Sequence, residues 1–299
     1  MQAALLVIAG PTAIGKTEIA VELAKKLSTE IISADSRQFY KEMNIGTAKP
    51  SEQELQEASH HFVGQLSIHD EYNASDFEFE ALDKLRELFK KHQTVIMAGG
   101  SGMYVDAVCK GIDNIPKIDP EIRKRLIERM EKEGVESLRK ELKALDPKSY
   151  QTIDLKNPKR ILKALEVTLI SGKPYSSFLS GTPKERFFQT LKIGLNRNRE
   201  ELHEIINQRV DKMIEKGLLE EVRELYPYRH LNPLKTVGYR ELFAYLDGDI
   251  SFEEAIRLMK RNTRRYARRQ LTWLSRDADI HWFHPDEKEK IIAFLKTKK

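Results

Sequence analysis

The sequence is poor in cysteine, and this limits the sites that it can build. Cys109 is its only cysteine, which excludes an intramolecular disulfide and a zinc site made of several cysteines. No run of eighteen apolar residues occurs, so no apolar transmembrane helix is expected. The apolar residues 1–10 lack the basic start of a signal peptide and predict a buried strand instead. These absences predict a protein of the reducing cytoplasm.

Acidic residues are missing from one part of the chain. The net charge is only +5, which is too mild to indicate a nucleic-acid partner. Residues 257–276, however, contain eight Lys or Arg residues and no acid. Such a block binds phosphate backbones in many proteins, although a solvated helix face has the same composition.

Short apolar runs alternate with amphipathic stretches, which predicts an α/β fold. We expect a parallel sheet flanked by helices, similar to that of P-loop NTPases. The expected strands are residues 4–9, 30–34, 94–98, 189–195 and 279–283. Helices are expected at residues 17–27 and at residues 78–91, the latter with Phe79, Leu82, Leu85, Leu88 and Phe89 as its apolar residues.

The strand pattern stops in the middle of the chain. Residues 119–132, 135–145 and 158–170 predict helices, the last with Asn157 as N-cap and Gly172 just past its end. We therefore expect an all-helical insertion domain over residues 116–182, within a P-loop core domain over residues 1–115 and 183–299.

The C-terminal third predicts mostly helices. We expect them at residues 200–215, at residues 218–225 and from a cap at Ser251 to Leu274. Along the last helix, basic residues recur every four positions and predict one broad basic face: Arg257, Arg261, Arg265 and Arg269, joined by Arg264 and Arg268.

Residues 10–17 match the phosphate-binding pattern G-x4-G-K-[ST], between a predicted strand and a predicted helix. Glycines let successive backbone N–H groups face an anion, and the helix N-terminus adds its dipole. Lys16 supplies a charge to phosphate oxygens and Thr17 a hydroxyl ligand for Mg²⁺. The loop predicts a diphosphate or triphosphate ligand without choosing between them. The candidate residues are Gly10, Pro11, Thr12, Ala13, Ile14, Gly15, Lys16 and Thr17.

Asp35 ends the second predicted strand, at the sheet edge where ligands of parallel sheets gather. It could ligate Mg²⁺, act as a general base or cap the following turn. The third strand ends in Gly99-Gly100-Ser101-Gly102 without an acid, which favours Asp35 as the catalytic carboxylate. Ser101 could donate a hydrogen bond to a ligand, while the glycines fit a tight turn equally well.

Together with other segments, these motifs resemble the tRNA dimethylallyltransferase (isopentenyl transferase) family over nearly the whole chain. GPTAIGKT is common to many P-loop proteins, whereas DSRQFY followed by IGTAKP is far more specific, and so is RRQLTW. Further matching segments are AGGSGMY, NPKRILKALEV and TVGYREL. The resemblance implies transfer of a dimethylallyl group from dimethylallyl diphosphate to N6 of adenosine 37 in tRNA, next to the anticodon.

The resemblance also implies roles for single residues. Lys16, the loop amides and Mg²⁺ would stabilise the departing pyrophosphate, and Asp35 would take a proton from the adenine amine. Ser101 stands where the family often has Thr, and would assist the amine and the phosphate. Arg209 matches an arginine that reaches the pyrophosphate, although an exposed helix charge has the same pattern.

A tRNA anticodon stem-loop is the implied partner, with the target base flipped into a channel of the protein. Phe39, Tyr40, Tyr104 and Tyr239 are candidate stacking residues, and the insertion offers Arg123, Lys124, Arg125 and Arg129 to phosphates. The implied tRNA-binding residues are Asp35, Ser36, Arg37, Gln38, Ser101, Arg123, Lys159, Arg160, Ile161, Leu162, Lys163, Lys235, Thr236, Val237, Gly238, Tyr239 and Arg240.

Three other functions stay open: a small-molecule kinase with ATP in the loop, an isopentenyltransferase of free adenine nucleotides, and a non-catalytic nucleotide-sensing RNA-binding protein. The basic block and DSRQFY disfavour the kinase, and the helical insertion favours tRNA over free nucleotides. Asp35 and the complete phosphate loop disfavour the non-catalytic protein. No heptad pattern or apolar patch indicates an oligomer, so a monomer without membrane contact is expected.

Overall fold

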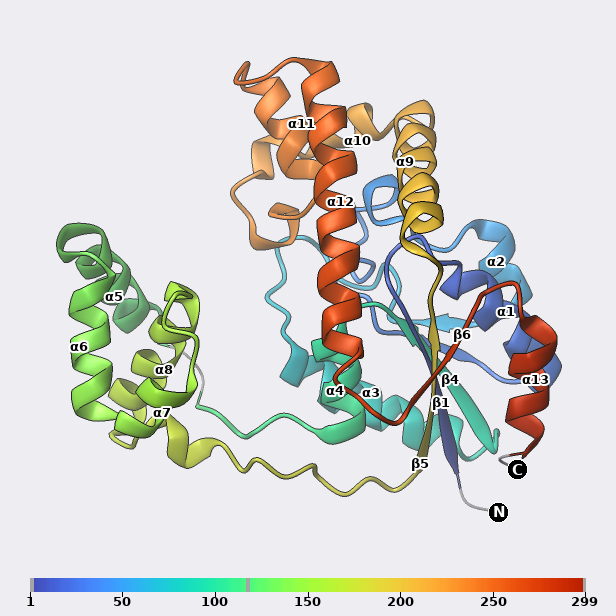
Figure 1. Cartoon of the computed structure of the whole chain (residues 1–299), viewed down its shortest axis with the longest axis horizontal. Coiled ribbons are helices and arrows are strands. Elements are labelled where there is room, and N and C mark those ends of the chain that lie inside the picture. Colours follow the sequence, from blue (N-terminus) through green and yellow to red (C-terminus); the bar gives the residue numbers. More distant parts are fainter. Residues whose placement is uncertain (1–2, 117–118, 298–299) are drawn as a thin grey trace. The chain divides into compact units, whose positions relative to one another are not determined.

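The computed structural model describes residues 3–116 and 119–297, which form two compact units (Figure 1). Unit 1 comprises Met1–Lys110 and Glu185–Lys299, and unit 2 is Gly111–Lys184. The sequence predicts the insertion at residues 116–182, so unit 2 is slightly longer at both ends. The backbone N–H and the hydroxyl of Ser180 donate to Asp113 Oδ1 at 2.9 and 2.6 Å, which joins the two connecting segments within unit 2.

Unit 1 is built on a six-stranded parallel sheet, which confirms the predicted fold class. Its order is β3 (His60–His61), β2 (Ile31–Ser33), β4 (Thr94–Gly99), β1 (Ala4–Ala9), β5 (Gln189–Leu195) and β6 (Ile280–Phe283). Ala9 is level with Gly99 on one side and with Gly194 on the other. The carboxyl ends of the three central strands therefore lie at one edge, where ligands bind in such sheets.

The helices of unit 1 pack on this sheet and on one another. They are α1 (Lys16–Leu27), α2 (Glu52–Glu57), α3 (Ala74–Leu88), α4 (Gly102–Lys110), α9 (Arg199–Glu215), α10 (Leu218–Leu225), α11 (Tyr239–Leu246), α12 (Phe252–Leu274) and α13 (Lys288–Thr297). Short 3₁₀ turns, η1 (Ile45–Thr47), η3 (Tyr226–Tyr228) and η4 (Asn232–Leu234), lie between them. Ile19, Ala20, Leu23 and Ala24 on α1 join the strand residues in a single core cluster.

The predicted limits of α3 were wrong, and so was part of its apolar face. The helix begins four residues earlier than expected, because Asn73 accepts hydrogen bonds from the N–H groups of Ser75 and Asp76. Phe77, Leu85 and Leu88 are buried, whereas Phe79 is 70% exposed. Residues two positions apart lie on different faces of a helix, so the face that buries Phe77 leaves Phe79 toward solvent.

Unit 2 is all-helical, as predicted. It contains α5 (Pro120–Glu133), α6 (Val135–Leu145), α7 (Pro147–Thr152), α8 (Pro158–Ser171) and the 3₁₀ turn η2 (Tyr175–Phe178). Leu126, Leu138, Leu142, Ile161, Leu162 and Leu165 form a core cluster of its own. The sequence did not predict α7, since six residues are too few for a periodic pattern. Its cap Asp146 also accepts from the backbone N–H of Ser176 at 2.7 Å.

Candidate active site

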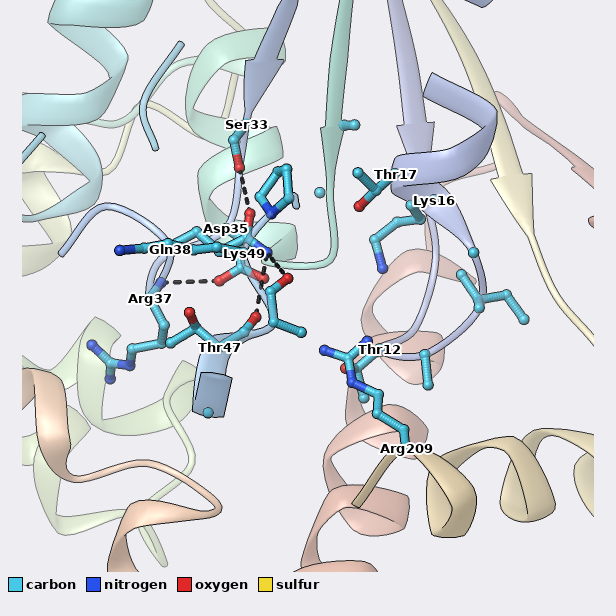
Figure 2. Close-up of a pocket in the computed structure, with 18 of the residues that line it drawn as sticks. Thr12, Lys16, Thr17, Ser33, Asp35, Arg37, Gln38, Thr47, Lys49 and Arg209 are labelled. Atoms are coloured by element: carbon cyan, nitrogen blue, oxygen red, sulfur yellow. Dashed lines mark hydrogen bonds between the residues drawn. The ribbon is translucent and has the colours of Figure 1, made fainter. Parts of the chain in front are cut away.

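A cavity of about 450 Å³ opens at the carboxyl edge of the sheet in unit 1 (Figure 2). The phosphate loop, the turn after β2 and helices α9 and α12 all contribute to its lining. The structure brings these predicted residues to it: Thr12, Ala13, Ile14, Gly15, Lys16, Thr17, Asp35, Arg37, Gln38, Arg209, Thr236 and Val237. Residues from four separate parts of the sequence therefore share one ligand-sized space.

The phosphate loop has the shape that its glycine pattern predicts. Gly15 is the N-cap of α1 at φ 94°, in the left-handed region that favours glycine. Lys16 begins the helix, and its ammonium group donates to the carbonyl of Pro11 at 2.7 Å. The lysine therefore lies across its own loop, beside the helix N-terminus, where an anion is stabilised.

Two half-buried cations, Lys16 and Arg209, line the cavity. Burial lowers the pKa of Lys16 to about 8, while the Asp35 carboxylate raises that pKa and the Arg209 guanidinium lowers it further. Burial also lowers the pKa of Arg209, against the effect of Asp35. In the part of the chain that the structure describes, neither cation forms an ion pair with a carboxylate. A diphosphate would supply the negative charge that this pair lacks.

Asp35 lies two residues beyond the end of β2 and both caps its turn and lines the cavity. Its Oδ1 accepts from the backbone N–H of Arg37 at 2.9 Å. Among the described residues no group donates to Oδ2. The cap and the catalytic role, which the sequence presents as alternatives, are thus compatible: one carboxylate oxygen fixes the turn while the other stays available.

Ser101 lies behind this turn rather than on the cavity wall. Its hydroxyl accepts from the backbone N–H of Ser36 at 3.2 Å and donates to the Ser36 hydroxyl at 3.4 Å. Ser101 is absent from the residues that line the cavity. In this structure it holds the residue next to Asp35, and contact with a ligand stays a prediction.

Gln270 on α12 is a residue of the site that the sequence analysis missed. Its Oε1 accepts from the backbone N–H of Thr12 and its Nε2 donates to the carbonyl of Gly100, both at 2.8 Å. One turn further, the indole of Trp273 donates to Asp106 at 2.8 Å. The motif RRQLTW therefore fixes both the phosphate loop and the turn after β4. A buried glutamine within a basic helix carries no periodic signal, and only the motif itself pointed to this segment.

The predicted tRNA-binding residues of unit 1 divide by exposure. Lys235 and Arg240 are exposed, and Thr236 and Val237 reach the cavity. Gly238 and Tyr239 are buried, so the side chain of Tyr239 presents no surface to RNA in this structure. The four candidate stacking rings are all buried, and for that reason the stacking prediction is not supported: Phe39, Tyr40, Tyr104 and Tyr239.

The same division occurs on α8 of unit 2. Lys159 and Arg160 are exposed at its first turn, and Lys163 is half-buried. Ile161 and Leu162 belong to the hydrophobic core of the unit, so their side chains present no surface to RNA in this structure, and contact of this segment with RNA stays a prediction. The basic members of this segment carry the positive charge that attracts a phosphate.

Arg123 in unit 2 lies beside a buried acid. Its Nε is 3.4 Å from Oε1 of Glu166, whose side chain is fully buried. Burial raises the pKa of Glu166, while Arg123 and Lys163 act in the opposite direction. The half-exposed Arg123 therefore has a partner within its own unit, and its use by RNA stays a prediction.

The basic face of α12 is narrower than predicted, because local partners engage part of it. Arg257 pairs with Glu254, Lys260 Nζ lies 2.7 Å from Asp211, and Arg264 donates to Asn207 at 2.6 Å. Arg265, Arg268 and Arg269 are exposed, and no described carboxylate forms an ion pair with them. These three arginines are the part of the helix that is available to an external phosphate backbone.

A magnesium site stays a prediction. Thr17 and Asp35 line the same cavity, and hydroxyl, carboxylate and phosphate oxygens are the ligands that Mg²⁺ prefers. Elsewhere, Glu201, His284 and Asp286 bring three potential ligand atoms within 4.8 Å of one another. Arg197 pairs with both acids of that cluster, which explains it without a metal.

Comparison with known proteins decides the family. The IPP transferase family model matches residues 38–277, which is most of the chain. The chain belongs to the tRNA dimethylallyltransferase family. It is 51% identical to tRNA dimethylallyltransferase 1 of Phocaeicola vulgatus, with 97% of each chain covered, and 51% identical to the enzyme of Christiangramia forsetii, with 98% of each covered. It is therefore a prenyl-transferring enzyme of tRNA modification.

Solved structures agree with this assignment. The full-length tRNA isopentenylpyrophosphate transferase of Bacillus halodurans superposes with a TM-score of 0.74 at 35% identity, over 99% of this chain and 97% of that one. A eukaryotic dimethylallyltransferase, studied while acting on tRNA, gives a TM-score of 0.78 at 26% identity, over 95% and 74% of the two chains. Among the described residues, no helix has both the length and the apolarity to cross a membrane.

Proposed function

We propose that the protein transfers a dimethylallyl group from dimethylallyl diphosphate to N6 of adenosine 37 in tRNA, which gives N6-dimethylallyladenosine and pyrophosphate. One observation carries the proposal: Lys16 of the phosphate loop, Arg209 of α9 and the available oxygen of Asp35 face the same cavity. Family membership makes tRNA the acceptor, and the cavity suits a donor with a diphosphate at one end.

The phosphate loop would bind the diphosphate of the prenyl donor. Breaking the allylic C–O bond places negative charge on the pyrophosphate oxygens, which Lys16, Arg209 and the loop amides would stabilise. A Mg²⁺ ion held by Thr17 and the phosphate oxygens would add positive charge there. Because both cations are half-buried, water weakens their attraction less than it would on an open surface.

Asp35 would act on the acceptor, the N6 amine of the adenine. The N6 amine attacks the allylic carbon, and its proton would pass to the carboxylate oxygen that the Arg37 N–H leaves free. An exocyclic amine is a weak nucleophile, so its orientation and the removal of its proton both accelerate the step. The adenine has to leave the anticodon stack to reach this carboxylate.

The RNA contacts are proposed from exposed basic residues. Arg265, Arg268 and Arg269 on α12 and Lys235 and Arg240 in the preceding segment would contact the phosphate backbone. Within unit 2, Lys159, Arg160 and Arg123 have the same chemistry. A cytoplasmic, monomeric enzyme stays a prediction.

The reaction is tested with the purified protein, Mg²⁺ and an unmodified tRNA anticodon stem-loop. We expect the stem-loop to gain the mass of one dimethylallyl group with dimethylallyl diphosphate and no mass with ATP. Free AMP should gain nothing under the same conditions. Label transferred from ATP, or to AMP alone, would replace the proposal by one of the alternative functions.

The role of Asp35 is tested by Asp35→Asn, with the exposed Asp249→Asn as control. We expect the transfer rate to fall by about 10²–10⁴-fold while stem-loop affinity persists, because only the proton acceptor is lost. The rate is followed by single-turnover mass spectrometry and the affinity by a binding titration. A variant that turns over at the rate of the unmodified protein would exclude Asp35 as the base.

A further inference from the structure

Glu221 on α10 holds a loop that forms part of the cavity wall. Its Oε2 accepts from the backbone N–H groups of Asn44 and Ile45 at 3.0 and 2.7 Å. Its Oε1 accepts from the N–H of Gly46 at 3.0 Å and from the hydroxyl of Tyr239 at 2.7 Å. One carboxylate therefore fixes three successive amides of the loop, each through a charge-assisted hydrogen bond.

Tyr239 is the side-chain partner of Glu221 in this arrangement. Its side chain is fully buried, and burial raises the pKa of its hydroxyl above the usual range, so that it stays a donor to Glu221. A Cβ on Gly46 would lie 2.6 Å from Cε2 of the tyrosine ring. Only glycine allows the loop to come this close, and the loop thus rests directly on the ring.

The held loop is joined to the turn that carries Asp35. The carbonyls of Thr47 and Ala48 accept from Nε2 of Gln38 at 3.3 and 3.0 Å (Figure 2). Oε1 of the same amide accepts from the hydroxyl of Ser33, the last residue of β2, at 3.1 Å. Both ends of the Gln38 amide are therefore used inside the protein, on either side of Asp35 in the sequence.

We propose that Glu221 is a positioning residue for the transfer reaction. Together with Tyr239 it fixes the loop of residues 44–48, the loop fixes Gln38, and Gln38 fixes the turn that aims Asp35 into the cavity. Glu221 does not line the cavity itself. The inference rests on the proposed function, because a displaced Asp35 matters only if it serves the acceptor.

The phosphate loop allows this role to be separated from general damage to the fold. None of the hydrogen bonds of Glu221 reaches residues 10–17, so pyrophosphate binding should not depend on it. The test uses Glu221→Ala and the milder Glu221→Gln and Tyr239→Phe. Glu224→Gln is the matched control, since Glu224 is an exposed glutamate on the same helix.

We expect Glu221→Ala to lower kcat for dimethylallyl transfer by about tenfold to a hundredfold, the cost of a small misplacement of a reacting group. The affinity for inorganic pyrophosphate, measured by calorimetry, should stay within about twofold of the unmodified protein. Glu221→Gln and Tyr239→Phe should give smaller losses of kcat in the same pattern, and they carry the test if the alanine variant does not fold. Glu224→Gln should leave both quantities unchanged.

Two results would overturn the inference. Variants with an unchanged kcat would show that the loop does not position the reacting groups. A loss of kcat matched by an equal loss of pyrophosphate affinity would show that Glu221 only supports the fold. If the unmodified protein fails to modify the stem-loop while it binds pyrophosphate, the proposed function fails, and the inference fails with it.

Discussion

The pKa of Lys16 leads to a quantitative prediction for the pH dependence of catalysis. Burial lowers this pKa to about 8 from an ordinary value of 10.5. The lysine must be charged to attract the diphosphate. The titration of Lys16 should therefore leave kcat/KM for the donor constant below pH 7 and lower it as the pH rises through 8. The charged fraction drops from about nine-tenths at pH 7 to about one-tenth at pH 9, which predicts a loss of about tenfold.

The assay is initial-rate transfer to a short anticodon stem-loop at subsaturating dimethylallyl diphosphate, in buffers from pH 6.5 to 9.5. Lys16→Arg is the control, because its guanidinium stays charged throughout and should give a lower but flat profile. Calorimetry should also show uptake of a proton on pyrophosphate binding above pH 8, since the bound anion favours the charged lysine. A flat profile for the unmodified protein between pH 7 and 9 would refute the reasoning.

Two further predictions concern buried polar side chains. Gln270→Leu leaves the Thr12 N–H and the Gly100 carbonyl without their partner, and should raise KM for dimethylallyl diphosphate by about tenfold while stem-loop affinity holds, with the exposed Gln151→Leu as control. Equal donor KM values for the two variants would contradict this. Glu166→Gln should raise Tm at pH 8 by about 2–4 °C and by less at pH 4, because a buried carboxyl with a raised pKa loses its stabilising contribution as the pH rises through that pKa. Melting curves that shift equally at both pH values, or only at pH 4, would disagree with it.

Features set by contiguous residues could be predicted from the sequence. The strand at Ala4–Ala9 and the phosphate loop behind it follow from an apolar run, the glycine pattern and the helical periodicity of α1. Asp35 could be placed near them because parallel strands gather their carboxyl ends at one edge. The predicted limits of α3 were wrong for a local reason. Asn73 caps the helix and sets its start at Ala74, ahead of the start that the apolar pattern around Phe79 suggested.

Features set by distant residues could not be predicted in this way. Gln270 lies 258 positions from Thr12, and Glu221 lies 175 positions from Gly46, so no window of sequence contains either pair. Both are polar residues in helices rich in exposed charged residues, so their composition alone does not mark them as internal. For Tyr239, the motif TVGYREL indicated an RNA contact, whereas the structure shows a buried ring whose hydroxyl donates to Glu221. A motif indicates that a segment matters without indicating which way its side chains point.

The long separation between Gln270 and the phosphate loop also affects how the protein is made. During translation, the segment of residues 10–17 leaves the ribosome first, and the glutamine that holds it follows only near the end of α12. Synthesis at about 5–20 residues per second leaves an interval of many seconds in which the loop lacks this support. A nascent chain should therefore acquire tight diphosphate binding only after α12 has emerged, so that chains released before this helix is made would not sequester the prenyl donor.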